Sequence, residues 1–153
     1  MTDQAAKNQW EHLFHGEYAD RRTILMNLTL EQVSARASAQ AHSIYDELWH
    51  TVLWQNIMVN RDEALYDATW QAGRRYPEHQ PTSLSEWTAL VEDFLSGLDS
   101  ALAWTTSPDR LNAEVNPGET MADILRGLAV HNAYHLGKIV AMRQAMNAWL
   151  PLS

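Results

Sequence analysis

The stretch TMADILRGLAVHNAYHLGKIVAMRQAM, residues 120–146, has the longest helical pattern in the chain. Thr120 followed three positions later by Asp123 is typical of a helix start, where both side chains bond free backbone N–H groups. Apolar residues then recur at steps of three and four positions: Met121, Ile124, Leu125, Leu128, Ile139, Met142 and Met146. We therefore expect one long helix from here to about Ala148, with one face buried in a core.

Three more amphipathic helices are expected upstream of this one. They cover residues 4–15, 43–60 and 83–102. Gly16 is placed to end the first helix, and Ser43 and Ser83 each begin a capping pattern with an acidic residue three positions on. Four amphipathic helices predict an all-α fold, a four-helix bundle.

The connection between the first two helices is long and mixed in character. Residues 29–32 could form a capping box for one short helical turn, while a weak alternation over residues 23–30 could instead indicate an extended segment. A connection of this length disfavours the simplest up-down-up-down order with short loops. Further along, we expect a short helix over residues 63–71 and a loop over residues 73–81.

Length and composition indicate one globular domain over residues 1–153. Apolar residues make up 46% and charged residues 20%, which is enough for a buried core and a hydrated surface. The net charge of −8 disfavours nucleic acid and anionic membranes as partners. The first residues lack the pattern of a secretory signal, so we expect a cytoplasmic protein. Because the chain has no Cys, any metal must be bound through nitrogen or oxygen.

Histidine is the residue type on which metal chemistry would depend. His131 and His135 are four positions apart, so both rings leave the same face of the last helix and can converge on one ion. A third ligand should then come from a facing helix. His50 is the best candidate because it lies well inside the second helix, on the side that carries Leu53 and Trp54. His42 precedes the helix start and His79 lies in a loop, whereas His12 or His15 on the first helix could also approach the site, although their spacing does not require it.

The residues around the His131 and His135 pair resemble a known family. Residues 131–143, HNAYHLGKIVAMR, resemble the last-helix pattern H-x-x-Y-H-x-G-[QK]-I-x-x-x-R of the DinB/YfiT-like superfamily of metalloenzymes. The segment from His42 to His50 resembles the second-helix element of that superfamily, and Pro117-Gly118 resembles its linker before the last helix. The resemblance covers most of the chain from the second helix onward.

This resemblance implies a four-helix bundle of DinB/YfiT-like topology with a metal centre of three histidines, which map onto His50, His131 and His135. Members of the superfamily often form dimers, so a homodimer is a further expectation. Some relatives resemble transferases that use a low-molecular-weight thiol, in which the metal binds the thiolate of a small cofactor. A chain without Cys would need such a thiol from outside.

Three neutral imidazoles leave a bound ion its full charge and an open coordination position, as in catalytic metal sites. Water bound there would be acidic enough for hydrolysis near neutral pH. The first hypothesis is therefore a metal-dependent hydrolase that acts on a small molecule through metal-bound water. The alternatives are a thiol-dependent S-transferase and a non-catalytic bundle that binds a metal or a ligand. The divalent ion could be zinc, nickel or iron.

A hydrolase also needs a general base or a group that orients the metal ligands. Glu47, three residues before His50, is the candidate for this role. Asp46 and Asp123 are more simply explained as cap partners of the residues that begin their helices.

Four other residues near the proposed centre bear on helix packing or on the shape of a pocket. Tyr134 is expected to pack in the core, with contact to the pocket as the alternative. Gly127 and Gly137 predict close helix approach, although Gly127 could instead leave room for a ligand. Trp54, one turn after His50, could line that pocket.

Overall fold

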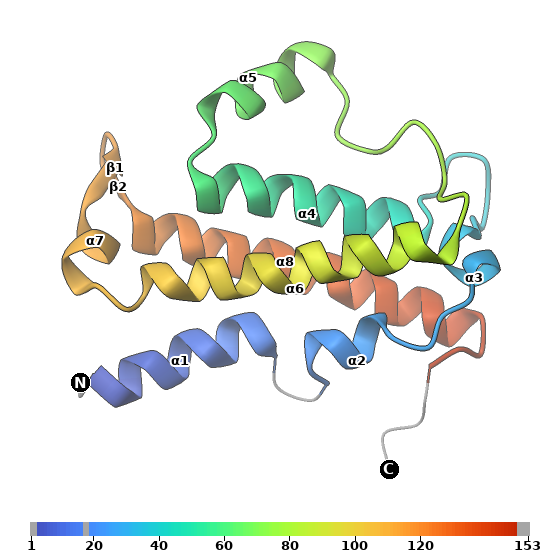
Figure 1. Cartoon of the computed structure of the whole chain (residues 1–153), viewed down its shortest axis with the longest axis horizontal. Coiled ribbons are helices and arrows are strands. Elements are labelled where there is room, and N and C mark those ends of the chain that lie inside the picture. Colours follow the sequence, from blue (N-terminus) through green and yellow to red (C-terminus); the bar gives the residue numbers. More distant parts are fainter. Residues whose placement is uncertain (1–2, 17–18, 150–153) are drawn as a thin grey trace.

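Four long helices form the body of the protein in a computed structural model that describes residues 3–16 and 19–149 (Figure 1). These helices are α1 (Asp3–His15), α4 (Ile44–Asn60), α6 (Leu84–Trp104) and α8 (Met121–Ala145). Helix α4 packs against α6 and α8, and α1 packs against the same two helices from the other side. The predicted all-α four-helix bundle is confirmed, and its four helices surround one core.

The helix starts follow the capping patterns read from the sequence. Ser43 Oγ accepts a hydrogen bond from the backbone N–H of Asp46 (3.0 Å), and Asp46 Oδ2 accepts one from the N–H of Ser43 (2.9 Å). Thr120 and Asp123 form the same reciprocal pair at the start of α8. The end of α8 was placed too late: the helix stops at Ala145 and not near Ala148.

The long connection between α1 and α4 contains two short helices, α2 (Arg21–Leu25) and α3 (Leu30–Ser34). The capping box predicted over residues 29–32 begins α3. The extended alternative over residues 23–30 is wrong, because the Asp20 side chain accepts from the N–H of Thr23 and starts a helix there (2.8 Å). Helix α2 continues the layer of α1 along the lower side of the view in Figure 1 and packs on α6 and α8.

Two additions lie outside the four main helices. Helix α5 (Glu63–Ala72) follows α4 and crosses above it in Figure 1, as the short helix predicted for this region. Before α8, the chain forms α7 (Pro108–Asn112) and a hairpin of β1 (Glu114–Asn116) and β2 (Glu119–Thr120), which were not predicted. Strands this short leave almost no alternation to read.

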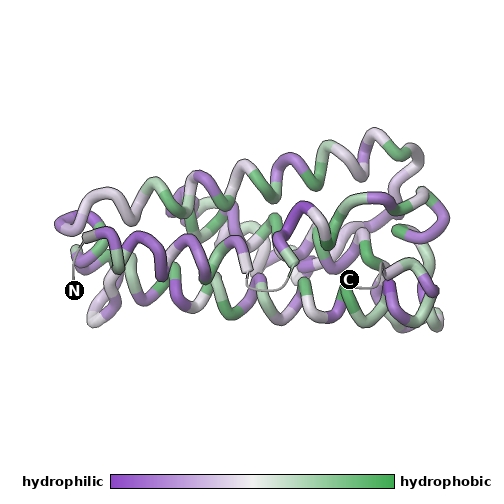
Figure 2. The backbone as a smooth tube through the Cα atoms, turned by 90° about the horizontal axis from the view of Figure 1, so that it is seen from below, coloured by the Kyte–Doolittle hydropathy of each residue, from purple (hydrophilic) through white to green (hydrophobic). Residues whose placement is uncertain are grey.

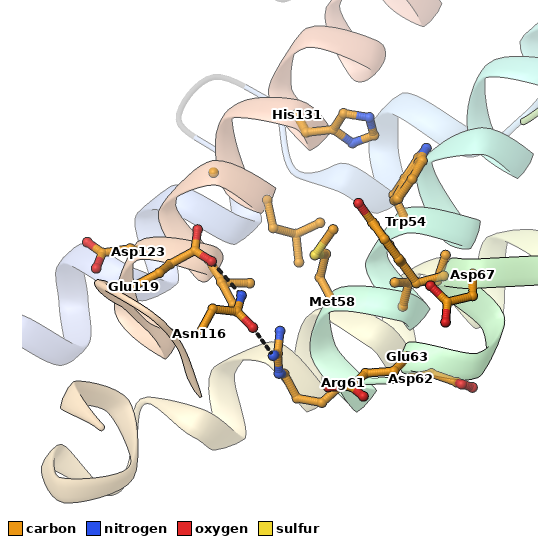
Figure 3. Close-up of a pocket in the computed structure, with 15 residues that line it drawn as sticks. Trp54, Met58, Arg61, Asp62, Glu63, Asp67, Asn116, Glu119, Asp123 and His131 are labelled. Carbon is orange, nitrogen blue, oxygen red and sulfur yellow. Dashed lines mark hydrogen bonds between the residues drawn. The ribbon is translucent and has the colours of Figure 1, made fainter. Parts of the chain in front are cut away.

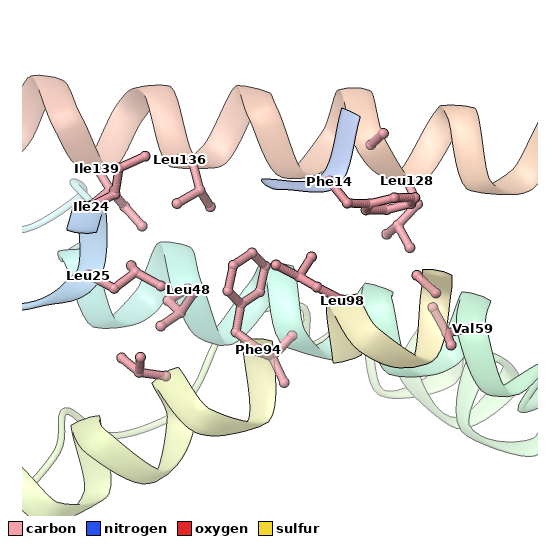
Figure 4. Packing of buried hydrophobic residues seen from close by; sticks show 14 of the residues in the cluster. Phe14, Ile24, Leu25, Leu48, Val59, Phe94, Leu98, Leu128, Leu136 and Ile139 are labelled. Carbon is pink, nitrogen blue, oxygen red and sulfur yellow. The ribbon is translucent and has the colours of Figure 1, made fainter. Parts of the chain in front are cut away.

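The core is built from one apolar stripe on each main helix. Hydrophobic and hydrophilic positions alternate along every helix (Figure 2), and the hydrophobic ones meet between the helices (Figure 4). Fully buried residues come from each of the four main helices and from α2: Phe14, Leu25, Leu48, Phe94, Leu98, Met121, Leu125, Leu136 and Ile139. Over the described residues, no helix has an apolar stretch long enough to cross a bilayer.

A small polar network links α4 to α6 and α8 near the middle of the bundle. The buried Gln55 donates from Nε2 to the carbonyl oxygen of Phe94 (2.9 Å) and accepts at Oε1 from Asn132 Nδ2 (3.0 Å). Gly97 allows this contact, because a Cβ atom at that position would collide with the amide of Gln55. Asn132 directly follows His131, so the network holds α4 and α8 in register next to the candidate site.

Candidate metal centre

The three histidines singled out in the sequence lie together between α4 and α8. His50 comes from α4, and His131 and His135 come from successive turns of α8. One ring nitrogen from each lies within 4.8 Å of the others. Nε2 of His50 is 3.2 Å from Nε2 of His131. Two imidazoles bound tetrahedrally at about 2.0–2.1 Å have nitrogens about 3.3 Å apart, so this pair is already at the spacing that a metal ion requires.

The remaining histidines are outside this cluster. His12 and His15 are exposed on α1, and His79 is exposed in the loop before α6. His42 lies closer, with Nδ1 3.4 Å from Glu47 Oε1, but it is not among the converging rings. The cluster therefore contains three histidines among the residues that the structure describes.

Hydrogen bonds fix the orientation of two of the three rings. His50 Nδ1 donates to the carbonyl oxygen of Arg75 (2.9 Å), and His135 Nδ1 donates to Glu47 Oε2 (2.5 Å). With Nδ1 protonated, Nε2 of each ring keeps its lone pair free. Nδ1 of His131 is buried and has no hydrogen-bond partner in the described structure. Hydrogen bonds thus set the tautomers of His50 and His135 and leave Nε2 of each ring free to bind a metal.

Burial keeps His131 and His50 in the form that binds metal. Burial, together with the positive charge of His135 and His50, lowers the pKa of His131 to about 4, against an opposing effect of Glu47. Burial also lowers the pKa of His50, although the hydrogen bond to Arg75 opposes this effect. His131 is therefore neutral at pH 7 and available as a ligand.

Glu47 is a buried carboxylate that lies behind the ligands. Its Oε1 accepts from Lys138 Nζ (2.5 Å), while Oε2 accepts from His135. Burial alone would raise the pKa of Glu47, but the hydrogen bonds from His135 and Lys138 and the charge of Lys138 outweigh it and bring the pKa to about 2. A carboxylate that orients a histidine in this way is a common feature of metal sites. The structure thus places Glu47 where it orients His135, and not on the wall of the pocket.

We expect Glu47→Gln to weaken zinc binding by about tenfold or more, because the amide no longer strengthens His135 as a ligand. Glu31→Gln, an exposed change on α3, should leave zinc affinity unchanged. Competition with a chromophoric chelator measures both affinities. Equal affinities in Glu47→Gln and the unchanged chain would contradict the role assigned to Glu47.

A pocket of about 700 Å³ extends from the histidine cluster along the outside of α4 (Figure 3). His131 lies at one end, and α5, the hairpin and the first turns of α8 form the other walls. Trp54 and Gly127 both line this pocket, as the sequence suggested. A cavity of this size accommodates a small organic molecule.

Close helix approach was the wrong explanation for Gly127 and Gly137. A Cβ atom at either position would meet nothing within 4 Å. The core packing expected for Tyr134 is also wrong, since this residue is 64% exposed. Tyr134 directly precedes His135 and therefore lies about 100° around the helix from it, on a more exposed side. Its ring is edge-on to that of His135, with 5.0 Å between the ring centroids.

Three neighbours of the cluster were not identified as functional residues from the sequence. The ring of Tyr76 stacks on His50 at 4.6 Å between centroids, and the backbone of Arg75 accepts from the same histidine. Both lie in the loop before α6, whose path leaves no periodic signal. Lys138 had a usable signal, because it lies one turn after His135 on the same helix.

Comparison with known proteins places this site within a family. A sequence model of the DinB superfamily matches residues 13–139, a span that includes all three clustered histidines and Glu47. Neither the curated proteins nor the solved structures gave a match. Because the matched span covers most of the chain, from the end of α1 to the second half of α8, the chain belongs to the DinB superfamily.

Proposed function

We propose that the protein is a metal-dependent hydrolase of a small molecule, with a divalent cation held by His50, His131 and His135. One observation carries the proposal: three imidazole nitrogens lie within 4.8 Å of one another, and one of the three rings, His131, lines a pocket of about 700 Å³. Zinc, nickel and ferrous iron all accept imidazole ligands, and the choice among them follows supply as much as ligand type.

The donor set fits such an ion. Buried polar atoms in folded proteins are nearly always hydrogen-bonded, and leaving one unpaired costs about 1–3 kcal/mol. His131 has one buried nitrogen without a partner and another that faces only the nitrogen of His50. A ring so poorly satisfied by the protein is typical of a binding site and not of a structural residue.

The proposed centre would also leave one coordination position of the ion free, as catalytic metal sites do. Among the described residues no fourth ligand joins the cluster, and both oxygens of Glu47 are already bonded to His135 and Lys138. Three protein ligands with a free position are typical of catalytic zinc, whereas structural zinc has four. When bound, such an ion supplies a Lewis acid and an activated water molecule.

The surrounding residues have separate tasks in this proposal. Glu47 and the Arg75 carbonyl hold two imidazoles in the tautomer that binds metal. The rings of Tyr76, stacked on His50, and Trp54, edge-on to it, cover this histidine and limit the access of bulk water to it. The pocket binds the substrate with its scissile group next to His131.

The test is hydrolysis of chromogenic ester, amide and phosphodiester probes by the zinc-loaded protein. We expect activity that a chelator removes and added zinc restores. Gly127→Leu should lower kcat/KM by at least about tenfold at unchanged zinc content, because the leucine fills part of the pocket beside the metal. Gly137→Leu is the matched control, since this position on the same helix is equally open but does not line the pocket.

Two results would contradict a hydrolase. A rate no higher than that of free zinc for every probe, with zinc retained tightly, would indicate a structural ion. A change in the visible spectrum of the cobalt-substituted protein on addition of a low-molecular-weight thiol would indicate the thiol-dependent transferase instead.

A further inference from the structure

The pocket next to the histidine cluster has an acidic lining, and we infer that its substrate carries a cationic group, an organic ammonium or guanidinium. The cation would lie between the carboxylates of α5 and that of Glu119 in β2, with the reactive end of the molecule toward His131. This inference rests on the proposed function, because it assigns a substrate class to the same pocket.

Charge in the pocket is strongly one-sided. The lining contains one basic side chain, Arg61, and five carboxylates: Asp62, Glu63, Asp67, Glu119 and Asp123. Arg61 is turned to the hairpin, where Nη2 donates to Asn116 Oδ1 (2.9 Å). Figure 3 shows Asp67 on the α5 side and Glu119 on the opposite side, so acidic groups flank the cavity on both walls, whereas the carboxylate of Asp123 is turned away from it. Such a lining attracts cations and repels anions.

Three of the five carboxylates have structural partners. Asp62 caps α5 through the N–H of Leu65, Glu119 accepts from Asn116, and Asp123 caps α8. Asp123 also forms an ion pair with Arg126 (3.1 Å), so of these three the carboxylates of Asp62 and Glu119 keep a negative charge that no basic side chain in the described structure offsets.

Glu63 and Asp67 are both exposed on α5, Glu63 in the first turn, where the helix N-terminus favours a negative charge, and Asp67 one turn further on. Neither makes a hydrogen bond or ion pair with any residue that the structure describes. They lie four positions apart on α5, a spacing at which like charges repel and weaken a helix. A cation bound in the pocket would relieve that repulsion.

Aromatic rings beside these carboxylates provide a second, independent feature suited to a cation. Trp54 and Tyr66 both line the pocket, with ring centroids 6.0 Å apart and planes at 69°. Tyr66 directly precedes Asp67 and is 40% exposed. Two rings at a steep angle next to carboxylates form the kind of surface that binds ammonium groups through cation–π attraction. The apolar Met58 and Ile57 leave room for an uncharged body in the same molecule.

Three probes with the same ring and chain but different charge test this inference: 4-phenylbutylamine, 4-phenylbutanol and 4-phenylbutyrate. Calorimetry with the purified protein at low ionic strength should show the amine binding about tenfold more tightly than the alcohol, and the carboxylate most weakly. Equal affinities for the amine and the alcohol would overturn the inference.

Matched variants identify the groups responsible. The double variant Glu63→Gln/Asp67→Asn should reduce the preference for the amine to about threefold or less. Asp93→Asn/Asp99→Asn removes the same charge from exposed positions on α6 and should leave the preference intact. Gly127→Leu should abolish binding of the amine, because the site is the pocket and not the outer surface of α5. A preference that survives in Glu63→Gln/Asp67→Asn contradicts the inference.

Zinc content measured on the same samples separates this inference from the proposed function. Zinc bound without a preference for the amine overturns the cationic substrate and leaves the hydrolase standing. A preference for the amine in a protein that binds no zinc supports the inference and removes the metal-dependent reaction.

Discussion

The double variant His131→Ala/His135→Ala is expected to contain no bound zinc after dialysis, whereas the unchanged chain retains about one ion. The change removes two of the three converging nitrogens and leaves His50 as a single ligand. One imidazole cannot hold an ion against water and buffer at micromolar concentration. Elemental analysis of the purified proteins measures the result directly.

The matched control is His12→Ala/His15→Ala. This pair also lies one turn apart on a single helix, but both side chains are exposed on α1 and outside the cluster. Zinc content should be the same as in the unchanged chain. Undiminished zinc in His131→Ala/His135→Ala, with its helical circular dichroism intact, would remove the metal centre from this account.

The largest expected effect on stability is at Arg143. Its side chain is 1% exposed, and Nη1 donates to the carbonyl oxygens of Ile24 (2.6 Å) and Met26 (2.9 Å) at the end of α2. Nε and Nη2 both donate to the carbonyl oxygen of Ala148. Arg143→Met keeps an unbranched, flexible side chain similar to the aliphatic part of arginine but leaves these buried acceptors without donors. We expect the free energy of unfolding to fall by about 3 kcal/mol.

Two further variants separate hydrogen bonding from charge at Arg143. Arg143→Lys keeps the charge but cannot reach both groups of carbonyls, so an intermediate loss is expected. Arg74→Met, which breaks an exposed ion pair with Glu78, should change stability by less than about 1 kcal/mol. Urea unfolding followed by circular dichroism measures all three, and a loss in Arg143→Met no larger than that in Arg74→Met would contradict this role.

The sequence alone was sufficient to predict the features that depend on residues a few positions apart. Helix starts could be predicted because Ser43 and Thr120 bond to residues only three positions away. The pairing of His131 with His135 likewise follows from the pitch of one helix. The placement of His50 required more, namely that its face of α4 turns toward α8, and the neighbouring apolar residues indicated this.

Contacts that depend on the path of a loop, or on how two distant helices pack, could not be predicted from the sequence. The stack of Tyr76 on His50 joins residues 26 positions apart through a segment without periodicity. The contact of Lys138 with Glu47 brings together two helices distant in sequence. In each case the residue type was visible, but its neighbour was set by tertiary packing.

The last-helix pattern also combines residues with unrelated roles. His131 and His135 belong to the candidate centre, and Lys138 bonds the carboxylate behind it. Arg143 instead anchors α2 and the segment after α8, away from the pocket. Tyr134 lies largely in solvent. A pattern read along one helix therefore cannot distinguish residues of the site from residues that hold the bundle together.

The contact between Glu47 and His135 has a consequence for how the centre comes into existence during folding. Its two partners lie 88 positions apart, on helices α4 and α8. Before α4 and α8 dock, the chain offers an ion only the His131 and His135 pair, without His50 and without the carboxylate that orients His135. Under the proposed function, tight loading with metal is thus a late event, and it reports that the tertiary structure is complete.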